Sequence, residues 1–415
     1  MKYKTVKLGE YLYIKGRIGW KGLKKNEYLS HSDYRIINGE SLTDDGIDWS
    51  KAGYITKERY DESPEIMLQE GDILVSKDGT IGKIGYITSL DAPTTVASGI
   101  FVIRNLNPEL IDTRFIYNFL CSKRFKDFIT MRTEGSVIPH LYQKDFVELD
   151  FPLPPIDEQK RIVSILDAIS SKIDLNKAIN NNLEQQALSI FYNLFASSDD
   201  SMETELGYIP RTFSVTKVGQ LPMIVTDYVA NGSFASLKEN VNLYQEPNYA
   251  YFIRNTDLKA DSFGVYVDKH SYEFLSKSAL FGGEIIISNV GDVGSVHLCP
   301  VLDRPMTLGN NIIMLRPSEE LRYYLYIWFK YAQGQSLIQG IKGGSAQPKF
   351  NKTDFKSLPI AIPNDTILCS FSSVVSPMFA LINSNKMENN RLIKIRDSIL
   401  PCLMTGEIDV SDVKF

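Results

Sequence analysis

GDILVSKDGTIGKIGYI, from Gly71 to Ile87, recurs as GEIIISNVGDVGSVHLC from Gly283 to Cys299, an offset of 212 residues (283 minus 71). In each copy two short β-rich runs flank a glycine-containing turn, which predicts a β-hairpin. Glycine can adopt positive φ in such a turn and lets the backbone approach a ligand closely, although a plain tight turn in a sheet is the alternative interpretation. The repeat predicts two domains of similar fold.

A second block repeats with nearly the same offset. GSVIPHLYQKDFVEL begins at Gly135 and GSAQPKFNKTDFKSL at Gly344, an offset of 209 residues (344 minus 135). A period of about 210 residues indicates a duplicated domain with its connector, because repeat arrays have periods of a few tens of residues. Strand-like IFVIRN and NIIMLRP precede helical stretches whose aromatic residues are expected to pack in the core. The predicted fold class is therefore mixed α/β (α+β).

Composition agrees with two globular domains. The chain has 415 residues, 43% hydrophobic residues and a net charge of 45 minus 50, or −5. Its four cysteines show no CxxC spacing and it has only four histidines, so we expect reduced thiols and no zinc cluster. The N-terminal sequence lacks a signal-peptide core, and we find no run of about 18 apolar residues. We expect a soluble, cytoplasmic protein without a membrane span.

Basic residues gather in particular segments, which a negative net charge permits. Residues 1–25 contain eight lysines and arginines and the single acid Glu10. The alternative to a phosphate-binding role is an ordinary solvated terminal segment. Further lysines and arginines surround the GSxxPx(L/F) block in both copies. Recurrence at corresponding places favours a surface that faces phosphates.

Polar residues of the two blocks differ between the copies while the frame is kept. Two domains that read different bases would need different polar residues on a constant frame, because base contacts specify sequence whereas phosphate contacts position the protein. The alternative is that drift between duplicated domains produced the same pattern. The candidate DNA contacts are Lys15, Arg17, Lys21, Lys77, Thr80, Lys83, Arg132, Ser136, His140, Tyr142, Lys144, Asn289, Asp292, Ser295, Lys342, Ser345, Gln347, Lys349, Asn351 and Lys352.

Each copy ends in a long amphipathic helix with a heptad-like seam. Two matching seams in one chain favour an intramolecular coiled coil, with buried asparagines that fix its register. The seams are Ile162, Leu166, Ile169, Ile173, Asn176, Asn180, Leu183, Ala187, Ile190 and Leu194, and Phe371, Val375, Met378, Ile382, Asn385, Asn389, Leu392, Arg396, Ile399 and Leu403.

A pseudo-two-fold axis between similar units requires the helices to run antiparallel. We then expect Asn176 opposite Asn389, Asn180 opposite Asn385, and Ile162 near Leu403. Roughly 35 helical residues would make a rod of about 50 Å. Such a rod would hold the two globular domains apart at a set distance.

At this point the sequence resembles a known family, the specificity subunit of Type I restriction-modification enzymes. The resemblance covers essentially the whole chain and rests on the two repeated blocks, LPPIDEQKRIVSIL, ELGYIPRTF and the closing LMTGEIDV. It implies target recognition domains at residues 1–157 and 198–363, and helical regions at 158–197 and 364–415. Each domain would read one half of a split, asymmetric DNA site. The helices would dock two methyltransferase subunits, to which motor-nuclease subunits attach.

Motifs of catalysis are not found in the sequence. There is no (N/D)PP(Y/F) methyltransferase motif, no GxGxxG loop and no P-loop. We expect no catalytic residue, metal or cofactor on this chain, with S-adenosylmethionine, ATP and Mg²⁺ on the partner subunits. Two alternatives stay open: a DNA-modifying enzyme with an unrecognised site, and a scaffold without salt-dependent DNA affinity.

Overall fold

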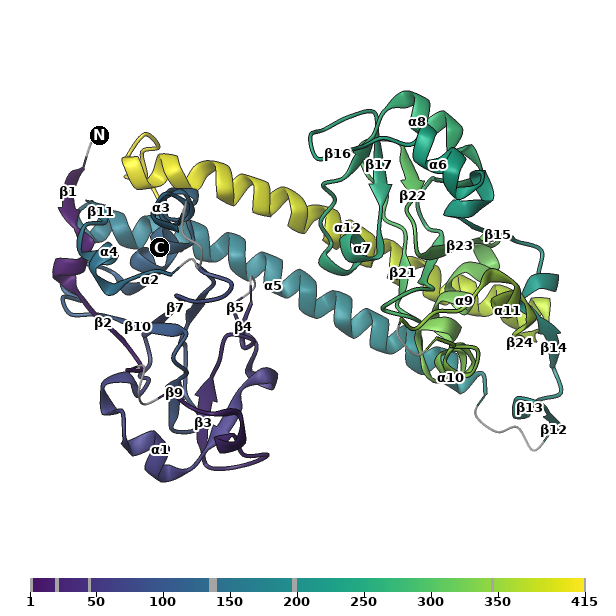
Figure 1. The fold of residues 1–415 in the computed structure, drawn as a ribbon, viewed down its shortest axis with the longest axis horizontal. Helices are drawn as coiled ribbons and strands as arrows, with labels where there is room; N and C mark the ends of the chain where they lie inside the picture. The colour runs from purple at the N-terminus through teal and green to yellow at the C-terminus, as the bar shows by residue number, and fades with distance from the viewer. Residues whose placement is uncertain are drawn as a thin grey trace. The chain divides into compact units, whose positions relative to one another are not determined.

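The protein forms two compact units. The structure is a computed structural model that describes residues 3–18, 22–43, 46–133, 140–195, 200–344 and 347–413. Unit 1 comprises Met1–Leu175 and Glu388–Phe415, and unit 2 comprises Asn176–Met387. The division falls inside both long helices, α5 (Ile156–Asn193) and α12 (Asp365–Thr405) (Figure 1). Each unit therefore contains one globular domain and one part of each helix.

The same four-stranded sheet lies at the centre of each domain. Unit 1 has the strand order β2-β10-β7-β8 and unit 2 the order β15-β23-β20-β21, and every neighbouring pair is antiparallel. The repeated stretch supplies the predicted hairpin in both copies, which confirms it. The strands are β2 (Leu12–Gly16), β7 (Ile73–Ser76), β8 (Ile84–Tyr86) and β10 (Ile100–Asn105), and β15 (Ile224–Asp227), β20 (Ile285–Ser288), β21 (Val296–Leu298) and β23 (Ile312–Arg316).

A second sheet in each unit contains a parallel pair. β3 (Tyr34–Ile37) pairs with β9 (Thr94–Val96), and β17 (Ala250–Ile253) pairs with β22 (Met306–Leu308). In unit 1 the sheet adds β6 (Gly53–Ile55). In unit 2 it extends to five strands with β16 (Leu243–Tyr244), β18 (Tyr266–Val267) and β19 (Ala279–Leu280).

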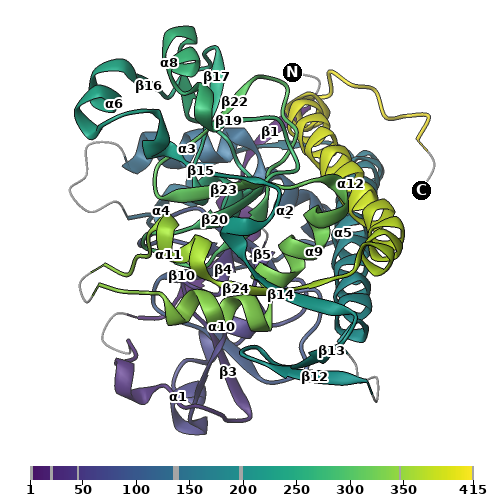
Figure 2. The same ribbon diagram turned by 90° about the vertical axis from the view of Figure 1, so that its right-hand side faces the viewer.

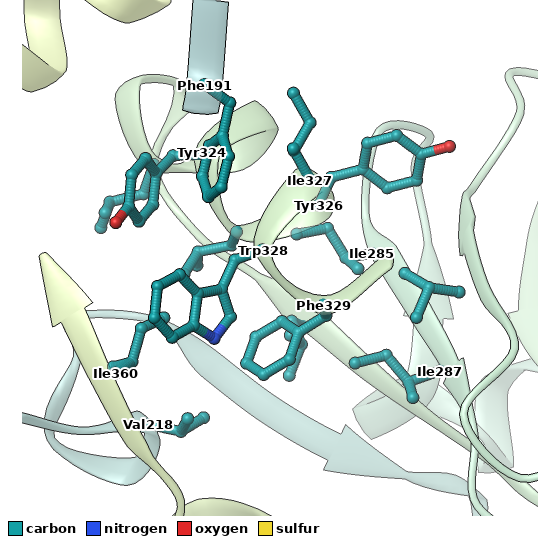
Figure 3. Packing of buried hydrophobic residues seen from close by; sticks show 14 of the residues in the cluster. Phe191, Val218, Ile285, Ile287, Tyr324, Tyr326, Ile327, Trp328, Phe329 and Ile360 are labelled. Carbon is teal, nitrogen blue, oxygen red and sulfur yellow. The ribbon is translucent and has the colours of Figure 1, made fainter. Parts of the chain in front are cut away.

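Two helices that follow the central sheet contribute the aromatic core. They are α2 (Thr113–Cys121) and α3 (Lys123–Thr133) in unit 1, and α9 (Glu319–Lys330) and α10 (Ala332–Gly340) in unit 2. Most of the aromatic residues of α2, α3 and α9 are buried, as predicted, whereas α10 has none, and Figure 3 shows Tyr324, Trp328 and Phe329 packed among aliphatic side chains. Such packing is the dominant stabilising contribution to each domain.

The remaining elements connect these layers. A strand pair leads into each long helix, β1 (Lys4–Lys7) with β11 (Asp150–Leu153) and β14 (Phe213–Lys217) with β24 (Pro359–Pro363). The others are α1 (Lys57–Asp61), α4 (Gln143–Val147), α6 (Phe234–Asn240), α7 (Asn255–Ala260), α8 (Lys269–Phe274), α11 (Lys352–Ser357), β4 (Leu42–Thr43), β5 (Gly46–Ile47), β12 (Ser201–Thr204), β13 (Gly207–Pro210) and short 3₁₀ turns, among them η7 (Tyr228–Asn231).

The long helices pack antiparallel within each unit. In unit 1, Ile162 near the start of α5 shares a core with Leu403 near the end of α12. In unit 2, Phe191 near the end of α5 shares a core with Phe371 near the start of α12 (Figure 1, Figure 2). The predicted antiparallel arrangement and the proximity of Ile162 to Leu403 are therefore confirmed.

Asparagines lie in the helix seam as predicted. Asn385 Nδ2 donates to Asn180 Oδ1 at 2.8 Å within unit 2, which confirms this predicted pair. Within unit 1, Asn389 Nδ2 donates to the Ile173 carbonyl at 3.4 Å. The expected pairing of Asn176 with Asn389 joins residues of different units and stays a prediction.

α12 contains more apolar sequence than we expected. An 18-residue window has a mean hydropathy of 1.5, enough by length and composition to cross a membrane, so the expectation that no such segment exists is wrong for this helix. Serines interrupt the apolar residues, so the window contains no long unbroken apolar run. Phe371, Val375 and Phe379 from it are buried in the core of unit 2. Because 33% of the window is buried, that packed face explains part of its apolar content.

A buried ion pair repeats in both sheets. Arg104 Nε lies 2.7 Å from Asp72 Oδ1, and Arg316 lies 3.1 Å from Glu284 at the corresponding place. Both carboxylates are almost fully buried, and each arginine also donates to a backbone carbonyl. The pair ties the end of one central strand to the turn that precedes another.

Arg104→Met is expected to lower the free energy of unfolding by about 2 kcal/mol, because Asp72 would remain buried without its cation. Lys7→Met is the matched control, since Lys7 and Asp150 are each about half exposed and their pair contributes less than about 1 kcal/mol. Urea unfolding monitored by tyrosine and tryptophan fluorescence measures both. Equal losses would contradict a special role for the buried pair.

Asn385→Leu is expected to cost about 1 kcal/mol, because it leaves the Asn180 amide without its partner in the seam. The double variant Asn180→Leu/Asn385→Leu should regain or exceed the wild-type stability, since both amides are then gone. Thermal unfolding of the three proteins provides the comparison. A double variant less stable than the single one would show that the pair contributes more than its desolvation costs.

Candidate nucleic-acid interface

The two repeated blocks meet at one end of the central sheet. In unit 1 the Leu141 N–H donates to the Lys77 carbonyl at 3.1 Å, and in unit 2 the Phe350 N–H donates to the Asn289 carbonyl at 3.0 Å. These positions correspond between the copies, since 77 plus 212 is 289 and 141 plus 209 is 350. The same backbone hydrogen bond therefore places the hairpin turn beside the GSxxPx(L/F) block twice.

Glycines shape the hairpin turn through backbone geometry. Gly79 and Gly82 have φ of 67° and 85°, and Gly291 and Gly294 have φ of 78° and 90°. A Cβ at Gly82 would lie 2.7 Å from Ile129 Cδ1. The glycines shared by the two copies are thus explained by the turn itself, whereas the residues between them differ from copy to copy.

Unit 1 places an aromatic and polar group at this end. His140 Nδ1 contacts Asp78 Oδ1 in the hairpin turn. The Tyr142 ring is 54% exposed and lies 4.5 Å from the His140 ring, and Lys144 Nζ lies 5.4 Å from the Tyr142 ring centre. The structure brings these predicted residues together, whereas Ser136 lies outside the described residues.

Three lysines lie on β2 and in the hairpin turn of unit 1, of which Lys15 is exposed and Lys77 and Lys83 are partly buried. Lys77 Nζ lies 4.9 Å from the Phe101 ring centre, and Thr80 belongs to the same turn. In the described part of the chain none of these lysines makes an ion pair. They are available to neutralise phosphates.

Arg17 is corrected by the structure. Its side chain is only 2% exposed, its Nε donates to the Val96 carbonyl at 3.1 Å, and burial lowers its pKa. A guanidinium held in this way cannot reach a phosphate, so Arg17 is a structural residue. Lys21 lies outside the described residues.

Arg132 is neutralised by its own domain. Its guanidinium lies 2.6 Å from Glu148 and 3.8 Å from Asp145. It is 40% exposed, so a phosphate would have to compete with Glu148. We rank it below the lysines as a DNA contact.

Unit 2 carries a cleft of about 630 Å³ at the corresponding end of its sheet. Asn289 from the hairpin and Lys349, Asn351 and Lys352 from the second block line it, and a Val290–Lys349 bridge joins the two blocks there. Lys352 Nζ lies 2.9 Å from Asp227 Oδ1, and Asn351 Oδ1 accepts from the Asp354 N–H at 2.8 Å. The structure thus brings these four predicted residues together.

Other predicted residues of unit 2 have different settings. Lys342, Gln347 and Lys349 are exposed, and Lys342 Nζ donates to Gln339 Oε1 at 3.3 Å. Asp292 lies 3.2 Å from Lys259, so its charge is compensated. Ser345 lies outside the described residues.

Ser295 is occupied by an internal contact. Its hydroxyl lies 2.8 Å from His297 Nε2 on β21. Burial, and to a lesser extent the positive charge of Lys330, lowers the pKa of His297 to about 4. A neutral imidazole at ordinary pH can accept the Ser295 hydroxyl proton, which removes Ser295 from the freely available donors.

Some lining residues of the cleft were not predicted from the sequence. Phe234 and Asp227 lie far from both repeated blocks along the chain, and no local pattern marks them. Asn311 also lines the cleft and has φ of 64°, although Gly99 at the corresponding place in the first copy does not have a positive φ. An asparagine is one of the non-glycine residues that adopt a positive φ most readily.

The remaining polar side chains to consider are those that could bind a metal ion. In the described ranges no three His, Cys, Asp or Glu residues are grouped so that they could hold a metal ion. The four cysteines are free thiols, and burial raises the pKa of Cys121 and Cys299.

Comparison with known proteins identifies the family. The model of the Type I restriction modification DNA specificity domain matches residues 1–185 and 211–396. The Type I restriction enzyme MjaIX specificity subunit of Methanocaldococcus jannaschii is 26% identical over 377 residues, covering 86% of this chain and 82% of that protein. The EcoKI specificity subunit of Escherichia coli is 23% identical over 402 residues, covering 92% and 84%.

A solved structure shows the same fold. The crystal structure of the Type-I restriction-modification system S subunit from M. genitalium matches with a TM-score of 0.53 at 17% identity, covering 97% of this chain and 96% of that one. The chain therefore belongs to the Type I restriction modification DNA specificity domain family and is a specificity subunit with two copies of that domain, not a catalytic subunit. The resemblance and the fold class predicted from the sequence are confirmed.

The stability of unit 2 should depend on His297 at acidic pH. Because the pKa is about 4 when folded and 6.5 ordinarily, the unfolded chain binds more protons between these values, and stability falls as pH falls from about 6.5 to about 4. His297→Gln should remove roughly 2 kcal/mol of this loss, a figure reduced for the partial exposure of the ring. Urea unfolding at a series of pH values tests this; identical slopes for both proteins would contradict it.

Proposed function

We propose that each domain reads one half of a bipartite, asymmetric double-stranded DNA site. The observation that carries the proposal is the backbone hydrogen bond that sets the same two blocks side by side in both units, Leu141 to Lys77 and Phe350 to Asn289. A constant frame with variable side chains at its tip is what two readers of different sequences require. Recognition is proposed to occur in the major groove, with the candidate residues other than Arg17 and Ser295 as contacts.

Different side chains at corresponding positions support the asymmetry of the target. By strand register Gly16 in unit 1 corresponds to Asp227 in unit 2, because they pair with Phe101 and Ile313. A Cβ built on Gly16 would lie 3.3 Å from Lys77 Nζ. Unit 1 therefore has an ammonium group close to the position where unit 2 has a carboxylate, and the two domains cannot favour the same chemical groups.

The helices are proposed to set the distance between the half-sites. A helix of 38 residues, such as α5, rises about 57 Å. Half-sites one helical turn apart, about 34 Å, lie on one face of the duplex, a distance that such a helix can span. This proposal includes the domain limits 1–157 and 198–363 and the helical regions 158–197 and 364–415.

Assembly with other subunits supplies the chemistry in this proposal. Two methyltransferase subunits would dock on the helices and bind S-adenosylmethionine, and motor-nuclease subunits would bring ATP and Mg²⁺. Support comes from the relatives, which are named specificity subunits of restriction enzymes. The cytoplasm, where the host DNA lies, is the proposed location.

Exchange of residues 1–157 for those of a relative should change only one half of the methylated sequence, because each domain carries its own sheet and turn frame. Methylome sequencing of strains with the wild-type and exchanged chains measures this. The reciprocal exchange of residues 198–363 is the control and should change the other half. A change of both halves by one exchange, or no change by either, would contradict independent reading.

A further inference from the structure

The cleft of unit 2 has a lining with no net charge. Its four charged residues are two carboxylates and two ammonium groups, Asp227 and Asp354 against Lys349 and Lys352. Asp227 is engaged by Lys352, and Asp354 accepts from Asn351 Nδ2 at 2.7 Å. A pocket for phosphate would be expected to carry an excess of positive charge, so this lining fits a less charged group.

Amide groups give the cleft its polar surface. Asn289, Asn310, Asn311 and Asn351 all line it. Asn289 Oδ1 is buried and has no hydrogen-bond partner among the described residues, while its Nδ2 reaches the Phe350 carbonyl at 3.3 Å. Asn310 and Asn311 are exposed. Both polar atoms of the Asn351 amide are bonded to Asp354. The exposed amides of Asn310 and Asn311 are therefore the ones that can donate and accept at once, which matches the edge of a base.

An exposed aromatic ring forms one wall. Phe234 is 81% exposed, and Val229 beside the same cleft is 44% exposed. The backbone under the ring is fixed, since Phe234 begins α6 and Ser233 Oγ accepts from the Ser236 N–H at 3.2 Å. A single exposed ring would be ordinary, but Phe234 and Val229 line the same cleft as Ile341, and a contiguous apolar surface in a cleft indicates a contact surface.

Lysines at the rim complete the arrangement. Lys349 is exposed, and Lys342 is exposed beside Gly343, which bridges to Lys349; neither lysine makes an ion pair with the described residues. They can hold phosphates while the amides and the Phe234 ring meet the bases, since phosphate contacts position a protein and base contacts specify the sequence. Duplex DNA matches this arrangement, because its phosphates lie on the outside and its base edges present hydrogen-bonding and methyl groups in the groove.

Resting on the proposed function, we propose that this cleft reads an A·T base pair in the half-site of unit 2, with an asparagine amide on adenine and the Phe234 ring on the C5-methyl group of thymine. In the major groove adenine presents N6 and N7, which asparagine can bind bidentately, and thymine presents its methyl group. Phe234 is thereby a specificity-determining residue.

The test uses the full chain assembled with its methyltransferase subunits and a duplex that carries the site found by methylome sequencing. Each thymine of the unit 2 half-site is replaced in turn by deoxyuridine, which lacks only the methyl group, and affinity is measured by fluorescence anisotropy. At one position the wild type should lose about fourfold in affinity, the contribution of one buried methyl group. Phe234→Ala should bind the thymine duplex about tenfold more weakly and lose nothing further with deoxyuridine.

Phe281→Ala is the matched control, because Phe281 is 66% exposed and precedes β20, at the opposite end of that strand from Asn289. It should bind DNA like the wild type. The proposal is overturned if deoxyuridine costs Phe234→Ala as much as it costs the wild type, if Phe281→Ala loses as much affinity, or if the half-site contains no A·T pair. Loss of subunit assembly by Phe234→Ala would also overturn it, whereas a wild-type complex without sequence preference would overturn the proposed function itself.

Discussion

One backbone hydrogen bond, made once in each unit, underlies the candidate interface. It joins the hairpin turn of the central sheet to a block more than 60 residues further along the chain, Lys77 to Leu141 and Asn289 to Phe350. Because the bond uses only backbone atoms, the side chains at both ends can change without disturbing it. The two domains could therefore diverge in chemistry while the frame stayed the same.

The long helices are attached to the domains by different means in the two units. In unit 1 the buried Gln159 of the LPPIDEQKRI motif accepts from the Asp112 N–H at 2.8 Å and donates to the Pro154 and Leu110 carbonyls. Leu368 stands at the corresponding place in unit 2, where Glu184 of α5 instead accepts from Lys330 and Tyr326 of α9. The departure of the second copy from the motif thus has a structural counterpart.

The two candidate sites differ in their surface charge. Unit 1 presents lysines without carboxylate partners around His140 and Tyr142, whereas the cleft of unit 2 balances its charges and exposes amides and Phe234. A cationic surface binds the DNA backbone strongly and a neutral, amide-rich surface discriminates among bases. Under the proposed function, the two units would therefore combine affinity and specificity in different proportions.

The sequence by itself determined the duplication, the hairpins, the aromatic core and the antiparallel seam with its Asn180 and Asn385 pair, because periodicity and repetition are local properties of the chain. Only the tertiary structure decided which polar residues reach the surface. Arg17 looked like its basic neighbours but is buried against Val96, and Phe234 carried no signal although it lines the cleft. Burial depends on what packs above a residue, and the segments that pack there are distant in sequence.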